Sequence, residues 1–185
     1  MPTIFRKLPF ACLCALSLFL TSCFHDDDDK YKEWRMQNQQ YVVDMQNLRE
    51  NGEPVYATIR PDWAPGNFVL MRWHNDRALT EKNLVPLYNS TCRVKYKAST
   101  IEEAIDSSYN LTTWGDSLYQ CKPSGAIIPG FSLALQNMHI GDSCTVVIPY
   151  FMAYDYATTS KIKKPFTTLI YDIKLVSIPA YEIPN

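Results

Sequence analysis

The chain has 185 residues, of which 46% are hydrophobic and 20% charged, a composition that predicts one folded domain with a sizeable core. Its formal net charge of -1 and its sequence pI near 6.3 provide no basic surface, so we exclude nucleic acid as a partner. Phosphate-binding, dinucleotide-binding, nucleophile-elbow and zinc-protease motifs do not occur, so we expect no cofactor and no metal.

The N-terminus has the pattern of a secretion signal. A basic pair at residues 6–7 precedes an apolar stretch over residues 8–20, which is short for a membrane-spanning helix. The sequence LTSC that ends at Cys23 resembles the bacterial lipobox, which implies that residues 1–22 are removed and that Cys23 is lipidated. The alternatives are an ordinary signal peptide with an incidental cysteine and an uncleaved anchor. We expect a lipid-anchored protein of the cell envelope, held at the outer membrane through Cys23.

Residues 23–30 contain four consecutive aspartates, which repel one another and predict a solvated acidic tether. The run resembles the acidic export signals of some Gram-negative surface lipoproteins. A generic acidic spacer and an enteropeptidase tag are the alternatives. Whether the protein faces the periplasm or the cell surface therefore stays open.

Residues 31–88 are expected to form an extension of helix and strand. Apolar residues recur at helical steps over residues 31–50, and Asn51-Gly52 is expected to end this helix. The apolar stripe consists of Trp34, Tyr41, Met45 and Leu48. We favour packing of this helix on the same domain, and the alternative is a dimerisation or spacer helix. Strands are predicted over residues 55–59 and 68–76.

The rest of the chain alternates between strand signals and one short helix. Residues 105–117 are expected to be irregular with a bulge, and Pro129 is expected to begin a helix with an apolar face. Further strands are predicted over residues 91–97, 144–148 and 167–176, with a tail over residues 179–185. Strands around a single helix, without long crossovers, predict an α+β fold in which an antiparallel sheet covers the helix.

Three cysteines follow the tether. Cys92, Cys121 and Cys144 would lie in an oxidising compartment, where one disulfide with one cysteine left over can form. Their spacing matches no metal-ligand motif, so a buried thiol is favoured for at least one of them. Which two of the three would pair stays open at this point.

Four ordered blocks resemble the FKBP-type peptidyl-prolyl cis-trans isomerases: IIPGF with ALQNMHIGD, TVVIP, Ala153-Tyr154 and TLIYDIKL. The resemblance covers residues 89–178, which we therefore expect to form an FKBP-like domain, a sheet wrapped around one short helix. It implies an enzyme that isomerises X-Pro bonds without a cofactor. Its partners would be proline-containing polypeptides, with a macrolide as a further ligand.

The resemblance also implies an aromatic pocket, and its residues transfer position by position. The implied catalytic residues are Tyr96, Asp106, Ile128, Phe131 and Tyr154. The implied substrate-binding residues are Ile105, Leu118, Ile127, Ile162 and Tyr171. The Ile128 N–H would hold a substrate carbonyl, and Leu118 aligns to within one residue of another pocket aromatic. Without the resemblance, Phe131 and Tyr171 would be interpreted as core residues and Asp106 as a turn former.

Three departures from the family pattern bear on ligand preference. Ile105 stands where the family usually has a phenylalanine, and Asp155 replaces a glycine. A basic rim formed by Lys161, Lys163 and Lys164 replaces an apolar one, which leaves macrolide affinity and peptide preference open. The leading hypothesis is an anchored isomerase that assists the folding of exported proteins. The alternatives are a non-catalytic FKBP-like peptide-binding module and a structural envelope lipoprotein.

Overall fold

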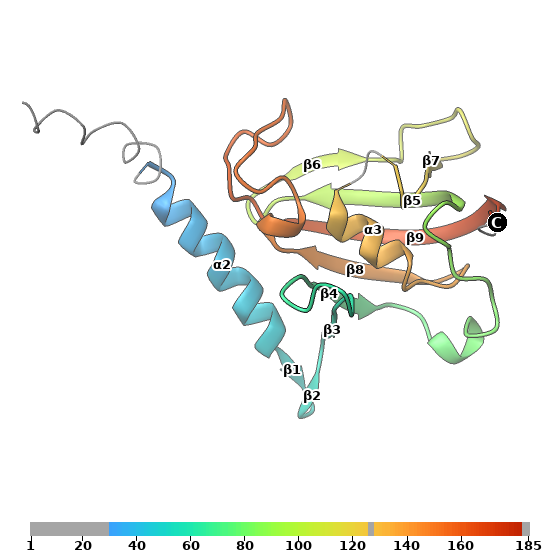
Figure 1. Cartoon of the computed structure of the whole chain (residues 1–185), viewed down its shortest axis with the longest axis horizontal. Coiled ribbons are helices and arrows are strands. Elements are labelled where there is room, and N and C mark those ends of the chain that lie inside the picture. The colour runs from blue at the N-terminus through green and yellow to red at the C-terminus, as the bar shows by residue number, and fades with distance from the viewer. Residues whose placement is uncertain (1–29, 126–127, 183–185) are drawn as a thin grey trace, which may run out of the picture.

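The computed structural model describes residues 30–125 and 128–182 (Figure 1). The signal, the lipidation site Cys23 and the pocket residue Ile127 lie outside the described residues. The helices are α2 (Lys32–Asn47) and α3 (Pro129–Leu135), with 3-10 turns η1 (Arg77–Leu79) and η2 (Tyr150–Met152). The strands are β1 (Arg49–Glu50), β2 (Glu53–Pro54), β3 (Ala57–Ile59), β4 (Val69–Trp73), β5 (Thr91–Ser99), β6 (Ala104–Ser107), β7 (Tyr119–Cys121), β8 (Ser143–Ile148) and β9 (Leu169–Ala180).

Seven of these strands form one sheet in the order β3-β4-β8-β9-β5-β6, and β7 pairs with β5 beyond this path. Every pairing within this sheet is antiparallel. The short helix α3 lies across one face of the sheet, while the long helix α2 runs beside one end of the sheet (Figure 1). This arrangement confirms the predicted α+β class, with one short helix covered by the sheet and an N-terminal helix added to it.

The core between α3 and the sheet follows from two periodicities. Helical spacing brings Phe131, Ala134 and Leu135 to one face of α3, and all three are buried. Alternation along β8 turns Cys144, Val146 and Ile148 toward the helix. Gly130 lies where the helix meets this core, because a Cβ there would come within 2.3 Å of Ile148 Cγ2. The helix can therefore approach the sheet this closely only with glycine at residue 130.

A second, smaller cluster lies on the opposite face of the sheet. Leu70 of β4 and Val147 of β8 alternate with residues of the α3 core, so they point away from α3. They pack with Val42 of α2 and with Tyr56, and all four side chains are buried. The favoured interpretation of the N-terminal helix is thus confirmed, because α2 packs on the same domain that carries α3.

The structure corrects three local expectations in the first half of the chain. The helix ends at Asn47, because Leu48 has an extended backbone and an exposed side chain. Asn51 and Gly52, with φ of 51° and 86°, instead form the turn between β1 and β2, since a tight hairpin requires positive φ at both positions. The buried side of α2 contains Asn38 and Val42 together with Trp34, whereas Tyr41 and Met45 are only half-buried.

Two expectations in the second half are corrected as well. Part of the segment 105–117 forms the edge strand β6, which pairs with β5 beside the bulge at Ala98/Ser99. Its sequence lacks a clear alternation because neither face of this short strand is fully buried. Strand β9 continues past Pro179 to Ala180, where only β5 still runs beside it. The missing N–H of Pro179 therefore removes no bond to a second neighbour.

Candidate active site

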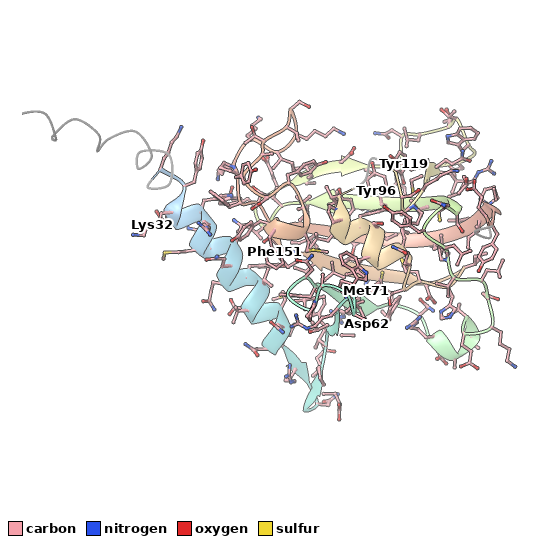
Figure 2. The ribbon with its side chains drawn as sticks, viewed as in Figure 1. Lys32, Asp62, Met71, Tyr96, Tyr119 and Phe151 are labelled. Atoms are coloured by element: carbon pink, nitrogen blue, oxygen red, sulfur yellow. The ribbon has the colours of Figure 1, made fainter. Side chains whose placement is uncertain are left out.

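An aromatic cluster lies between α3, the middle of β5 and the starts of β7 and β9. The ring centroids of Phe131 and Tyr171 are 5.1 Å apart, and those of Tyr96 and Tyr171 are 5.8 Å apart. Tyr119 packs edge-on against Tyr96 at 5.6 Å, and Figure 2 shows these two side chains next to one another near α3. Burial comes first among the causes that raise the pKa of Tyr171.

Asp106 of β6 binds the edge of this cluster. Its Oδ2 accepts a hydrogen bond of 3.0 Å from the Tyr96 hydroxyl, and its Oδ1 accepts one of 2.9 Å from the Ser107 N–H. The Lys161 Nζ lies 2.7 Å from Oδ1. Burial acts to raise the pKa of Asp106, but the hydrogen bonds from Lys161, Tyr96 and Ser107 outweigh it and lower that pKa. The carboxylate therefore stays ionised and fixes the Tyr96 ring.

Tyr154 and Ile128 are the two remaining residues that the resemblance assigns to catalysis. The Tyr154 side chain is 39% exposed, and its hydroxyl contributes, after burial, to the raised pKa values of Tyr171 and Tyr119. No hydrogen bond of this hydroxyl is found within residues 30–125 and 128–182. Ile128 is buried at the N-cap of α3, where its carbonyl accepts from the N–H groups of Phe131 and Ser132.

The backbone at Asp155 explains one departure from the family pattern. Asp155 has a φ of 54°, in the left-handed region that glycine adopts freely and aspartate tolerates better than most residues. Its N–H donates to the Tyr150 carbonyl at 2.8 Å, and its own carbonyl accepts from the Phe166 N–H at 2.7 Å. These bonds hold the turn beside Tyr154. The position thus requires an unusual conformation, which both residue types can supply.

The loop that carries the lysines is packed onto the cluster by its apolar residue. Ile162 is buried within the α3 core, while its neighbour Lys161 reaches Asp106. Thr159 holds the turn, since its hydroxyl accepts from both the Lys161 and the Ile162 N–H groups. Ile105 of β6 is half-buried against the same core. One wall of the site is therefore aliphatic and its mouth carries a paired, rather than a free, lysine.

Helix α2 holds the far end of this loop through polar contacts. The Asn38 Oδ1 accepts a hydrogen bond of 2.7 Å from the buried Thr168 N–H, and the Trp34 Nε1 donates to the Thr167 hydroxyl at 3.1 Å. Lys164 lies 3.9 Å from the centre of the Trp34 ring and forms an ion pair of 2.9 Å with Glu102. The N-terminal helix thereby fixes the start of β9 and the base of the rim.

The structure brings most of the residues expected at the site to one region. The rings of Tyr96, Phe131 and Tyr171 are in mutual contact, and Asp106 accepts a hydrogen bond from Tyr96. Ile105 and Ile162 pack against the same core. At the position where the alignment was uncertain, Tyr119 supplies the aromatic ring, and its neighbour Leu118 is half-buried. Sequence reasoning also missed the contact between Lys161 and Asp106, because 55 residues of chain separate them. Recognition of the pairing between β7 and β5 would have predicted Tyr119 at the site.

The chemistry available here is binding and desolvation, without an activated nucleophile. The aromatic rings form an apolar wall, and the described side chains hold no group of three or more residues suited to a metal ion. Across the described ranges, no helix is long and apolar enough to cross a membrane. Such a site can hold an apolar ring and orient the amide next to it.

Comparison with known proteins identifies the family. The model of the FKBP-type peptidyl-prolyl cis-trans isomerase family matches residues 85–176. Curated protein sequences give no significant match. A solved peptidyl-prolyl cis-trans isomerase from Pseudomonas syringae pv. tomato has a TM-score of 0.62 at 19% identity, covering 80% of this chain and 95% of that one.

Two further solved structures are similar. FkpA from Escherichia coli has a TM-score of 0.55 at 24% identity, covering 85% of this chain and 61% of FkpA. The structure of the three FKBP domains of wheat FKBP73 has a TM-score of 0.51 at 23% identity, covering 59% of this chain and 45% of that one. These likenesses concern the fold, and the family model concerns the sequence of the same domain. Together they show that the chain belongs to the FKBP-type peptidyl-prolyl cis-trans isomerases.

Proposed function

We propose that this isomerase acts on X-Pro bonds of polypeptides exported to the cell envelope, and that the aromatic cluster is its catalytic pocket. The observation that carries the proposal is the contact of Tyr96, Tyr119, Phe131 and Tyr171 in one aromatic cluster, with Asp106 at its edge. A proline ring is apolar and compact, so it can pack against these rings.

The reaction needs little more than this environment. Rotation about an X-Pro amide meets a barrier of about 18–20 kcal/mol because the C–N bond has partial double-bond character. The planar amide is the more charge-separated form, so a dry pocket favours the twisted one. No proton leaves the substrate. We assign the Ile128 N–H to hold the carbonyl of the peptide, and the Tyr154 hydroxyl to hold the turn around proline.

The Asp106 carboxylate acts through Tyr96. It accepts the Tyr96 hydroxyl proton in a hydrogen bond and so fixes the ring that packs against Phe131 and Tyr171. Lys161 neutralises this carboxylate at the mouth, which keeps an unpaired charge away from the apolar wall. We therefore expect substrates with an apolar residue before proline to be preferred over those with a charged one.

A prolyl-isomerisation assay on peptides varied before the proline tests the site. Tyr154→Phe removes one hydrogen bond of about 0.5–1.5 kcal/mol, so the rate should fall about 2–10-fold. Tyr156→Phe is the matched control, because Tyr156 is 76% exposed and outside the cluster. Equal rates for wild type and both variants would exclude Tyr154 from the site. Absence of catalysis with every peptide would favour a non-catalytic binding module.

The location is a separate proposal, supported by the lipobox-like sequence and the acidic tether. We propose that the protein is anchored at the outer membrane through lipidated Cys23. Labelling with palmitate should mark the wild type and not Cys23→Ala. Proteolysis of intact cells then distinguishes a surface-facing from a periplasm-facing protein. Label on Cys23→Ala, or none on the wild type, would remove the anchor from the proposal.

A further inference from the structure

Two cysteines lie directly opposite one another on neighbouring strands. Cys92 of β5 and Cys121 of β7 are partners in the antiparallel register. Directly opposite residues point to the same face of a sheet, with Cα atoms about 4.5–5.5 Å apart. This separation lies within the range of about 4.4–6.8 Å that a disulfide bridges without backbone movement. Both side chains are buried in the core under α3.

The third cysteine lies too far away to compete. Cys144 of β8 is opposite Ile173 of β9, and Ile173 is in turn opposite Tyr96 of β5. Strand β9 therefore separates Cys144 from β5, at two strand spacings of about 4.8 Å each. Cys92 lies four residues before Tyr96 along β5, which increases the distance further. The Cys144 Sγ packs instead against the Met138 Sδ at 3.8 Å.

We propose that Cys92 and Cys121 form a cross-strand disulfide and that Cys144 remains a thiol. In the structure all three are free thiols. One thiolate attacks a low-molecular-weight disulfide such as oxidised glutathione, which releases one glutathione thiolate and leaves a mixed disulfide. The second cysteine thiolate attacks this mixed disulfide and releases the second glutathione. The two thiol protons and two electrons end on two molecules of reduced glutathione.

The burial of the pair determines when this reaction occurs. Burial raises the pKa of Cys92 to about 11 and that of Cys121 to about 12, so the reactive thiolates are scarce in the folded protein. The bond therefore forms during folding, before the core closes. Once formed, it is shielded from reducing thiols by the same packing. This behaviour is that of a structural disulfide rather than of a reversible switch.

The bond would brace the candidate active site. It closes the segment of residues 93–120, which contains Tyr96, Asp106 and Tyr119. It also ties the short strand β7, which is bonded to β5 alone, to the rest of the sheet. Because a closed loop of this length restricts the unfolded chain, loss of the bond should lower Tm by on the order of 10 °C.

Refolding the full chain tests the pairing. A Cys12→Ala, Cys14→Ala, Cys23→Ala background leaves the three cysteines in question, and it is refolded with reduced and oxidised glutathione. After denaturation, a maleimide should label one thiol, and a chymotryptic digest without reductant should contain Cys92 linked to Cys121. Three labelled thiols, or a linked peptide that contains Cys144, would overturn the proposal. Neither readout depends on isomerase activity or on location in the cell.

Thermal unfolding with and without reductant distinguishes the effect of the disulfide from that of side-chain packing. The Tm of the refolded parent should fall by on the order of 10 °C when reductant is present during unfolding. Cys92→Ala and Cys121→Ala should show a Tm that reductant does not change, and their double variant should add little to either. Cys144→Ala is the matched control, since it opens a similar cavity but should retain the full response to reductant. A response that persists in Cys92→Ala would contradict the pairing.

Discussion

The two helices pack on opposite faces of the central sheet and are attached in different ways. On one face α3 packs through fully buried apolar and aromatic side chains, among them Phe131 and Leu135. On the other face α2 has a small apolar contact around Val42 and further polar contacts, among which Asn38 accepts from the Thr168 N–H and Trp34 donates to Thr167. Figure 2 shows Phe151 between α2 and the sheet. The difference suggests that α3 forms the site and that α2 supports the loop around it.

Truncation on the α3 face should have the largest effect. Phe131 is 2% exposed and packs against Tyr96 and Tyr171, so Phe131→Ala should lower the free energy of unfolding by about 3–5 kcal/mol. Trp63→Ala is the control, because Trp63 is 84% exposed and its loss should change stability by about 0.5 kcal/mol or less. Urea denaturation measures both. Similar losses for the two variants would contradict the assignment of the core to this face.

Removal of the polar contact on the α2 face should have a smaller effect. Asn38→Ala leaves the buried Thr168 N–H without its partner, which should cost about 1–3 kcal/mol in the free energy of unfolding. Gln40→Ala tests the general effect of shortening a polar side chain on α2, since Gln40 is exposed and its side chain donates to Asp44 on the same helix. The same denaturation experiment applies. A loss for Asn38→Ala as small as that for Gln40→Ala would mean that the α2 face is not held by this bond.

The turn at Asp155 should show an effect of backbone conformation. Asp155→Val places a β-branched residue at a φ of 54°, which should cost about 1–2 kcal/mol. Asp155→Gly fits the same φ, so its stability should stay close to that of the wild type. Thermal unfolding of the two variants, side by side, measures the difference. If valine were tolerated as well as glycine, backbone strain could not explain the choice of residue here.

The ion pair at the mouth should have the smallest effect on stability. Lys161→Met removes an exposed partner of Asp106, so the free energy of unfolding should change by about 0.2–1 kcal/mol at neutral pH. The folded pKa of Asp106 is lowered, so the contribution is present above its unfolded pKa of about 3.9. It is lost as the pH falls through the folded pKa.

Titration by NMR checks this account of the ion pair. The pKa of Asp106 should rise in Lys161→Met, because the lysine is a main cause of its lowered value. Lys163→Met serves as the control, since Lys163 is the neighbouring lysine of the same loop and forms no ion pair among the described residues. An unchanged Asp106 pKa in Lys161→Met would remove Lys161 from the site.

The contrast between the two faces also explains how much could be predicted. Apolar residues at period 3.6 in α3 and at period 2 in β8 predict the α3 core, because burial on one face requires those spacings. The docking of α2 depends on Asn38 and Thr168, which are 130 residues apart. A polar residue on a helix normally indicates a solvated position, so its burial becomes visible only with its partner.

The residues of the candidate site likewise divide into those that could be predicted and those that could not. Resemblance to the family brought Tyr96, Asp106 and Phe131 together, and their contacts depend on neighbouring strands and one helix. The contribution of Tyr119 depends on the register of the short strand β7, and that of Lys161 depends on a loop. Neither register nor loop conformation follows from a local pattern, because both are determined by tertiary packing.

The central claim is that the α3 face catalyses isomerisation, whereas the α2 face only supports it. The most direct measurement is kcat/KM for one X-Pro peptide, at a temperature where all the proteins are folded. Phe131→Leu should reduce kcat/KM by about tenfold or more, equivalent to about 1.4 kcal/mol in the transition state, and Asn38→Ala should leave it within about twofold. Equal losses in the two variants, or an unchanged rate in Phe131→Leu, would contradict the account.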